Sequence, residues 1–474
     1  MNGEERREGR RVFVCFLGIG SHTKDPGYEV LRYEHPDGRT YETRFAQRAI
    51  IEAAGAASFD SIVLFATTTS REKHLELLKA ELLEIGCRED AIHVKEDVRD
   101  AQTSEEQWKW FELLLLCIQD GDEVVFDFTH GFRSVPIVFS TAIAYLQRVR
   151  SFRLAHAFYG YMDTKAKCDS PAEQQSKDTK PKPEGPSPGR IIDMAPFFRI
   201  NDWTDAVSRL VHSADAGRLA ELAETADEAG SFAELRDPEL VRALTELTAA
   251  IKDVRVNDVG AAAGTALKIV KARRERCKGA DRQLLQMVIE KFGELGRHVE
   301  TDGYTQEYFE VQYALVDMLL EHELFMQAFT AMREAVASLG MVGVRGKYRR
   351  KSRLGSDGRR HRKRFGELFA AMCAIERNDW KWEVQPEQVG DGQMRDFAHL
   401  LPFWNALEEA GHGQRLQEVM PKVGRLRNAY DHGWTAVGKK SDLGNAAEVG
   451  REALSVLREV TPDLIGIGAR LSNE

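Results

Sequence analysis

The sequence of 474 residues lacks the features of membrane proteins and of metal- or disulfide-stabilised domains. No apolar run approaches the roughly 20 residues that span a bilayer, and the charged N-terminus lacks the apolar core of a signal peptide. The cysteines form no CxxC pair and the histidines form no HExxH pattern, so neither a disulfide framework nor a zinc site is expected. The formal net charge of -9 is not that of a protein that coats nucleic acid. We therefore expect a cytoplasmic protein without a metal, a cofactor or a membrane partner.

A chain of this length exceeds one hydrophobic core, and its first part alternates between strand-like and helix-like segments. Apolar strand patterns occur at 11–17, 61–65, 92–95, 123–128, 155–161 and 190–194. Helical patterns occur between several of them, at 43–54, 71–86 and 104–119. This order predicts a parallel sheet with helices on both faces. The proline-rich stretch 164–189 is expected to be a disordered excursion.

From about residue 200 onward the strand patterns disappear and helical spacing dominates. The expected helical segments are 204–227, 238–253, 260–275, 281–299 and 305–339. A seam is expected near 276–304. We predict an α/β domain over 1–200, a helical connector over 201–300 and a second helical domain over 301–474.

Polar and glycine residues gather where two of the predicted strands end. In parallel α/β sheets, ligands bind beyond the carboxyl ends of the strands. After the third helix-like segment, the strand 123–128 leads into a helix start at Ser134 and Pro136, which presents free N–H groups and a positive dipole end. The candidate binding residues at the two strand ends are Gly18, Gly20, Ser21, Thr129, His130, Gly131 and Arg133. They suit an anion such as phosphate, whereas a purely turn-building role for the same residue types is the alternative.

Asp127 fits an anion site less simply, because a carboxylate repels phosphate. We assign it to orienting the turn or to a ribose hydroxyl. The segment Asp127-Phe-Thr-His-Gly131 resembles the DxTHG signature of CRISPR-associated proteins with a CARF domain, and 158–161 and 192–197 carry supporting phrases. The resemblance implies a Rossmann-like sensor that binds a cyclic oligoadenylate, such as the tetra- or hexa-adenylate, across a homodimer or a higher oligomer.

Near the C-terminus, Arg427, Asn428 and His432 resemble the R-x4–6-H motif of HEPN ribonucleases, which are all-helical. Arg88 and His93 have the same spacing, but they lie in an expected helix-to-strand connection, whereas Arg427–His432 ends a helical segment. Histidine can transfer protons near neutral pH, arginine stays charged beside phosphoryl oxygens, and the asparagine could orient either one.

Five positions on an ideal helix place the arginine and histidine side chains roughly 140° apart. A single helix therefore makes an awkward complete site, and the resemblance implies a composite of two copies. The alternative is local: Arg427 pairs with Asp431 four residues on, and His432 merely caps the helix.

Together these features imply a CARF–HEPN protein: a metal-independent endoribonuclease that cyclic oligoadenylate activates and that cleaves single-stranded RNA in type III CRISPR antiviral defence. The alternatives are a non-catalytic ligand-gated regulator and a sensor domain that cleaves its own ligand. Between 345 and 364 lie eleven lysines and arginines. This basic segment is either a solvated loop or a surface that guides RNA to the cleavage site.

Overall fold

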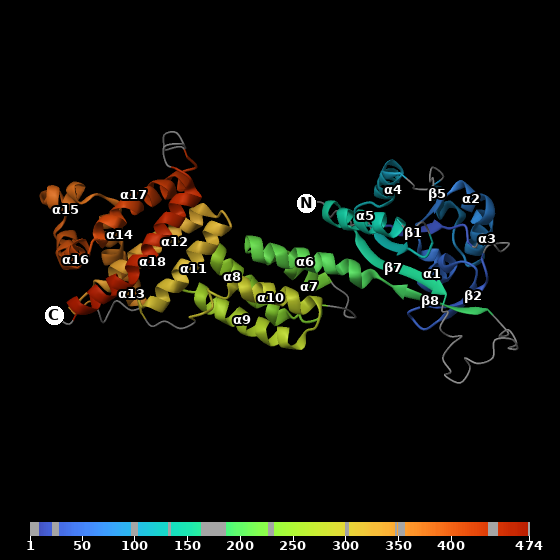
Figure 1. Cartoon of the computed structure of the whole chain (residues 1–474), viewed down its shortest axis with the longest axis horizontal. Coiled ribbons are helices and arrows are strands. Elements are labelled where there is room, and N and C mark those ends of the chain that lie inside the picture. Colours follow the sequence, from blue (N-terminus) through green and yellow to red (C-terminus); the bar gives the residue numbers. More distant parts are fainter. Residues whose placement is uncertain are drawn as a thin grey trace, which may run out of the picture. The chain divides into compact units, whose positions relative to one another are not determined.

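The computed structural model describes residues 9–20, 28–95, 103–130, 134–162, 186–225, 232–298, 303–346, 348, 356–434 and 444–472. The chain divides into two compact units, Met1–Asn201 and Asp202–Glu474. The first contains the sheet, and the second consists of helices (Figure 1). The predicted fold class, α/β followed by all-α, is confirmed. The further division of the helical part near residue 300 stays a prediction.

One eight-stranded sheet forms the first unit, in the order β3-β2-β8-β7-β6-β1-β4-β5. Its strands are β1 Arg11–Leu17, β2 Leu31–Glu34, β3 Thr40–Thr43, β4 Ser61–Ala66, β5 Ile92–Lys95, β6 Glu123–Asp127, β7 Arg153–Met162 and β8 Ser187–Asp193. The β2–β3 and β7–β8 pairs are antiparallel and the other pairs are parallel. The sheet is therefore mixed rather than wholly parallel. The sequence patterns missed β2 and β3 because these strands are short and largely polar.

The expected excursion at 164–189 falls mostly outside the described residues. Its last residues are described, and those from Ser187 onward belong to β8, which pairs with β2 and β7. The prediction therefore extended too far at this end. The proline-rich composition concealed a strand whose alternate residues are buried.

Helices cover both faces of the sheet, as expected (Figure 1). They are α1 Ala46–Ala54, α2 Thr68–Ser70, α3 Glu76–Glu84, α4 Ser104–Cys117 and α5 Val135–Val149. Phe13, Cys15 and Leu17 of β1 share a core with α1 and α3. Val12, Val14 and Phe16 face the opposite core, with α4 and α5. Both sets are buried because successive side chains of a strand point to opposite faces.

The strand order reverses at β1. After β1 the chain forms β2 and β3 at one edge of the sheet, and then β4 and β5 on the opposite side of β1. It next returns to form β6, which neighbours β1 on its other side. β1 pairs in parallel with both β4 and β6. The carboxyl ends of β1 and β6 therefore flank a topological switch point, where open α/β sheets bind their ligands.

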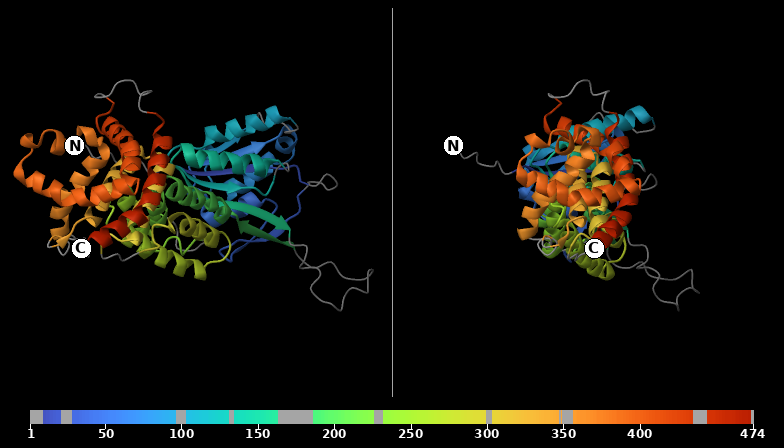
Figure 2. Two further views of the ribbon diagram at one scale, coloured as in Figure 1. Left: turned by 60° about the vertical axis from the view of Figure 1, so that its left-hand side comes forward. Right: turned by 90° about the vertical axis from the view of Figure 1, so that its left-hand side faces the viewer.

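The second unit consists of helices, beginning within α6 (Figure 2). They are α6 Ala195–Ser213, α7 Gly217–Thr225, α8 Pro238–Lys252, α9 Val259–Arg276, α10 Ala280–Phe292, α11 Gln306–Glu321, α12 Phe325–Val342, α13 Ser356–His361, α14 Glu367–Ala374, α15 Lys381–Val384, α16 Asp391–Glu409, α17 His412–Asp431 and α18 Ala446–Leu471. Two predicted helices are each divided in two. Ala214 and Glu323 stand at these breaks with positive φ angles of 49° and 57°, outside the right-handed helical region.

The centre of the second unit is α12, which packs against α11, α14, α17 and α18. Most of its length is buried, including an unbroken run from Ala335 to Met341. A helix that is buried on all sides needs such a continuous apolar sequence. α12 thus supports the end of α17 on which the second candidate site lies.

Candidate functional site

The structure brings two of the predicted strand ends together at the switch point. Gly18 follows β1, and a Cβ atom added to it would lie 3.2 Å from the Cβ of His130, which follows β6. Gly20 has a φ of 65°, in the left-handed region that glycine enters without strain. Glycine at position 18 therefore allows the end of β1 to approach His130 closely, and glycine at position 20 allows the left-handed backbone of the turn.

The turn after β6 is organised around Asp127. Its Oδ1 accepts hydrogen bonds from the backbone N–H and the hydroxyl of Thr129, the former at 2.8 Å. The Thr129 hydroxyl also accepts the backbone N–H of Gly160 in β7, at 2.8 Å. Asp127 thus orients the turn, as one of its two predicted roles requires, and Thr129 ties this turn to the neighbouring strand.

Burial shifts the pKa of two groups in this turn. Desolvation raises the pKa of Asp127 to about 6, against the lowering effect of the Thr129 hydrogen bonds. Burial, with a smaller contribution from His74, lowers the pKa of His130 to about 4. His130 is therefore neutral at neutral pH and supplies no positive charge to an anion in this state. Asp127 Oδ2 and His130 Nε2 are buried without a hydrogen-bond partner among the described residues.

Sequence reasoning missed two rings that complete this cluster. Tyr28 packs edge-on against His130 and His74, with ring centroids 5.0 and 4.8 Å apart. His74 Nε2 lies 3.2 Å from the carbonyl oxygen of Ile19. Neither residue belongs to a motif, and only the tertiary structure brings them beside the strand ends.

Ser21, Gly131 and Arg133 lie outside the described residues. α5 follows this segment, and Ser134 and Pro136 stand at its N-terminus as the sequence predicted. The Ser134 side chain makes no capping hydrogen bond within the described chain. The binding roles of the seven predicted residues stay predictions.

The second candidate site lies at the C-terminal end of α17, where Gly433 follows the last residues of the helix. Its φ is 55°, and its N–H donates to the Tyr430 carbonyl at 3.2 Å. The N–H of Trp434 donates to the Ala429 carbonyl at 2.7 Å. This pair of bonds is the Schellman motif. The Trp434 ring packs on Tyr430, which in turn contacts Phe325 of α12.

Arg427 is half-buried and forms an ion pair of 3.0 Å with Asp431. His432 is the C-cap of α17 and, like Asn428, is exposed. One chain thus shows the local arrangement that the alternative interpretation predicts. The arginine and asparagine lie on the last turns of the helix, and the histidine lies where the helix ends. Their catalytic role stays a prediction.

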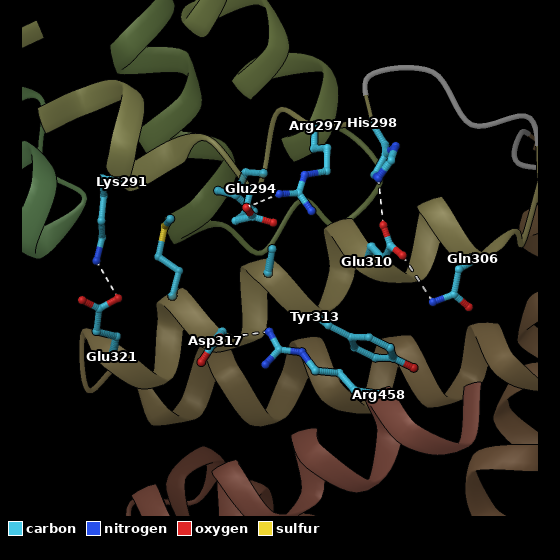
Figure 3. A pocket seen from close by; sticks show the side chains of 13 residues that line it. Lys291, Glu294, Arg297, His298, Gln306, Glu310, Tyr313, Asp317, Glu321 and Arg458 are labelled. Carbon is cyan, nitrogen blue, oxygen red and sulfur yellow. Dashed lines mark hydrogen bonds and ion pairs between the residues drawn. The ribbon is translucent and has the colours of Figure 1, made fainter. Parts of the chain in front are cut away.

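A cleft of about 480 Å³ opens in the second unit between the end of α10, α11 and α18 (Figure 3). Its lining contains none of the predicted site residues. Ion pairs of 2.7 to 2.9 Å cross it: Lys291–Glu321, His298–Glu310 and Arg458–Asp317. Because Lys291 and Arg458 are already paired with carboxylates, the cleft is not a strong anion site.

No group of three or more histidine, cysteine, aspartate or glutamate side chains in the described ranges is arranged to hold a metal ion. The same part of the chain contains no helix that is both long and apolar enough to cross a bilayer.

No family model matches the sequence. A curated CRISPR-associated protein of Methanocaldococcus jannaschii is 24% identical over 126 residues, which are 26% of this chain and 17% of that protein. The chain is similar to a CRISPR-associated protein. This similarity confirms the resemblance that the DxTHG residues indicated, and the aligned part spans less than a fifth of that relative's length.

Among solved structures, the chain is similar to Csm6 of Enterococcus italicus bound to cyclic hexa-2'-fluoro-hexa-dAMP. The alignment covers 97% of this chain and 95% of the Csm6 chain. The TM-score is 0.47 and the sequence identity is 13%.

Proposed function

We propose that the protein is an endoribonuclease of type III CRISPR defence that a cyclic oligoadenylate activates and that cleaves single-stranded RNA without a metal. The observation that carries the proposal is the pairing of two motifs on separate units. The DxTHG turn lies at the switch point of the α/β unit, and Arg427–His432 lies at an exposed helix end of the all-α unit.

The activator is proposed to bind at the carboxyl ends of β1 and β6. The N-terminus of α5 offers N–H groups and a positive dipole end to a phosphate. The unpartnered Asp127 Oδ2 and His130 Nε2 are polar atoms that a nucleotide could satisfy if the turn opened. A neutral His130 would then donate to or accept from the ligand rather than pair with its charge.

An exposed apolar face on the same unit supports a homodimer. It lies on α4 and α5 and consists of Trp108, Leu116, Ile137, Tyr145 and Val149, which are 47 to 73% exposed. Phe111 bridges the two helices, with its ring 5.4 Å from Trp108 and 5.7 Å from Tyr145. Contiguous exposed apolar surface of this kind marks an interaction site. Since α5 starts at the DxTHG turn, a second copy docked here would bring a second turn to a ring with repeated phosphates.

In the cleavage reaction, the ribose 2'-hydroxyl attacks the adjacent phosphorus, and the 5'-oxygen of the next nucleotide leaves. The products are a cyclic phosphate end and a free hydroxyl. His432 is proposed to transfer protons, and Arg427 to stabilise the pentacoordinate phosphate. To contact the phosphate, Arg427 must break its ion pair with Asp431 or bind both groups at once. A second copy of the helix end would supply the groups on the other side of the phosphate.

The cleft offers a route for coupling within the second unit. The ion pairs Lys291–Glu321 and His298–Glu310 join the segment before residue 300 to α11. A shift of that segment would move α11, which packs on α12 and α18. Binding of the activator could in this way alter the helix ends that carry the motif.

A fluorescent single-stranded RNA tests the proposal, with purified protein, EDTA, and cyclic tetra- or hexa-adenylate present or absent. We expect activator-dependent cleavage that His432→Ala abolishes while activator binding, measured by calorimetry, is unchanged. His93→Ala is the matched control, because it removes the exposed histidine of the other pair with the same spacing. Its cleavage should equal that of the wild type.

The second candidate function is a non-catalytic regulator gated by the same ligand. The local Arg427–Asp431 pair and the capping position of His432 favour it. Activator binding without RNA cleavage would replace the ribonuclease proposal by the regulator. Cleavage that survives His432→Ala would refute only the catalytic role of His432.

A further inference from the structure

A surface of rings and cations forms where the described part of the basic segment 345–364 packs against α16. We call it the aromatic–basic surface. Its rings are Tyr348, His361, Phe365 and His399, and its exposed cations are Arg359, Arg360, Lys363 and Arg364. None of these residues belongs to either candidate site.

The rings form one connected cluster around Tyr348. Its centroid lies 5.8 Å from His361, 5.4 Å from Phe365 and 5.4 Å from His399. His399 Nε2 accepts the backbone N–H of Arg345 at 3.1 Å, which fixes the start of the segment on α16. Burial, and then the nearby Arg345, lower the pKa of His399, so its ring stays neutral and able to accept this bond. The described ends of the basic segment are therefore held at a defined place on α16.

The guanidinium of Arg364 lies over two rings of this cluster. Its guanidinium carbon is 5.6 Å from the Tyr348 centroid and 5.1 Å from that of Phe365. Asp396 holds the same guanidinium by two hydrogen bonds, one of 3.0 Å from Nε and a second from Nη2. The side chain remains 40% exposed. A guanidinium fixed in this way presents its outer face as a platform on which a base can stack.

Three of the neighbouring cations have no carboxylate partner among the described residues. Glu334 pairs with Arg362 at 2.6 Å, and Asp396 is taken by Arg364. Arg359, Arg360 and Lys363 are exposed and form no ion pair with any described residue. A cationic strip thus runs beside the stacking platform, which is the combination that binds single-stranded nucleic acid.

We propose that the aromatic–basic surface binds single-stranded RNA, with phosphates on Arg359, Arg360 and Lys363 and a base on Arg364. The inference rests on the proposed function and identifies a substrate-holding surface separate from the cleavage site. Exposed bases and a flexible backbone make a single strand, rather than a duplex, the ligand that can use both the platform and the strip.

The two sites lie at opposite ends of α12. Tyr430, next to the cleavage motif, contacts Phe325 and Phe329 at the start of this helix. Arg345 follows its end. The 18 residues of α12 span about 27 Å, and Figure 1 shows α13 and α17 on different sides of this part of the chain. The surface is thus too far away to touch the reacting phosphate, so it should act on KM and not on kcat.

The first experiment measures binding of an oligo(A) RNA by fluorescence anisotropy from 50 to 400 mM salt, in the His432→Ala background so that no cleavage occurs. The variant Arg359→Gln/Arg360→Gln/Lys363→Gln should reduce the slope of log K against log salt by about 2, since each phosphate contact contributes about 0.7. The matched control is Arg242→Gln/Lys268→Gln/Lys271→Gln, three exposed cations of α8 and α9 without an ion pair in the described chain. The proposal is overturned if the slope is unchanged in the Arg359/Arg360/Lys363 variant. It is also overturned if the slope falls by the same amount in the Arg242/Lys268/Lys271 control.

The second experiment separates stacking from charge. Arg364→Lys keeps the charge but loses the planar face. We expect about tenfold weaker binding of oligo(A) and unchanged binding of an abasic strand of the same length. Equal losses for both strands would refute stacking, and thermal unfolding of the variant checks that the fold is intact.

Binding and cleavage assays distinguish the two proposals. In otherwise wild-type protein with activator, the triple variant should raise KM and leave kcat unchanged. Wild-type RNA binding without cleavage would refute the ribonuclease and leave the surface intact. Cleavage with unchanged KM in the triple variant would refute the surface alone.

Discussion

Two glycines near the C-terminal end of α17 should respond in opposite ways to replacement by alanine. One replacement should lower the free energy of unfolding and the other should raise it. Gly433 has a φ of 55°, whereas Gly424 lies in the interior of α17. An added Cβ would meet no atom within 4 Å at either position. The effect of Gly→Ala at both sites therefore comes from the backbone alone.

The expected sizes follow from these conformations. Alanine in the left-handed region costs about 1 kcal/mol, because its Cβ crowds the following carbonyl oxygen. Alanine in a helix interior is about 1 kcal/mol better than glycine. Gly433→Ala should therefore destabilise, Gly424→Ala should stabilise, and the two should differ by about 2 kcal/mol. In a domain of this size, each change corresponds to a Tm shift of about 2–4 °C.

Scanning calorimetry of the full chain measures both shifts, and the RNA assay measures their consequence. Gly433→Ala loosens the turn that places His432, so cleavage should fall along with Tm. Gly424→Ala should raise Tm and preserve cleavage. Shifts of the same sign for the two variants would refute the assignment of the left-handed cap.

Three further predictions concern the α/β unit. Thr129→Val removes the hydroxyl that joins Asp127 to the Gly160 N–H, so it should lower the free energy of unfolding by about 1–3 kcal/mol and weaken activator binding. Thr129→Ser keeps the hydroxyl and should retain the stability and the binding of the wild type. A serine variant that binds the activator as weakly as the valine variant would count against this role. The folded-state pKa of Asp127, about 6, lies above its ordinary 3.8, so its contribution to stability is complete below about pH 3.8 and is lost as the pH rises through 6. Asp127→Asn should remove this loss of about 3 kcal/mol, measured as Tm against pH, and an unchanged pH profile would refute the buried carboxyl. Tyr145→Glu should dissociate the proposed homodimer, as measured by analytical ultracentrifugation. The control Lys109→Glu changes an exposed charge on the same helix pair and should leave the dimer intact. If the Tyr145→Glu variant still sediments as a dimer, this face is not the interface.

Apolar runs and their spacing were sufficient to predict most buried elements. β1 and β5 have the predicted bounds, and α8 and α9 differ from them by one residue at most. Such segments pack on a core whatever their neighbours are, so their pattern is local. β2, β3 and the start of β8 escaped prediction, because polar edge residues become strands only when a neighbouring strand pairs with them.

The sequence by itself determined which residues carry candidate chemistry: the Asp127–Gly131 turn, the Arg427–His432 pair and the basic segment. Their types and order are covalent facts that motifs can detect. Only the tertiary structure decided that β1 and β6 meet at the switch point, that Tyr28 and His74 close around His130, and that Arg364 lies on the Tyr348 ring. These contacts join residues far apart in the chain, and burial and pairing arise only once the packed core has brought them together.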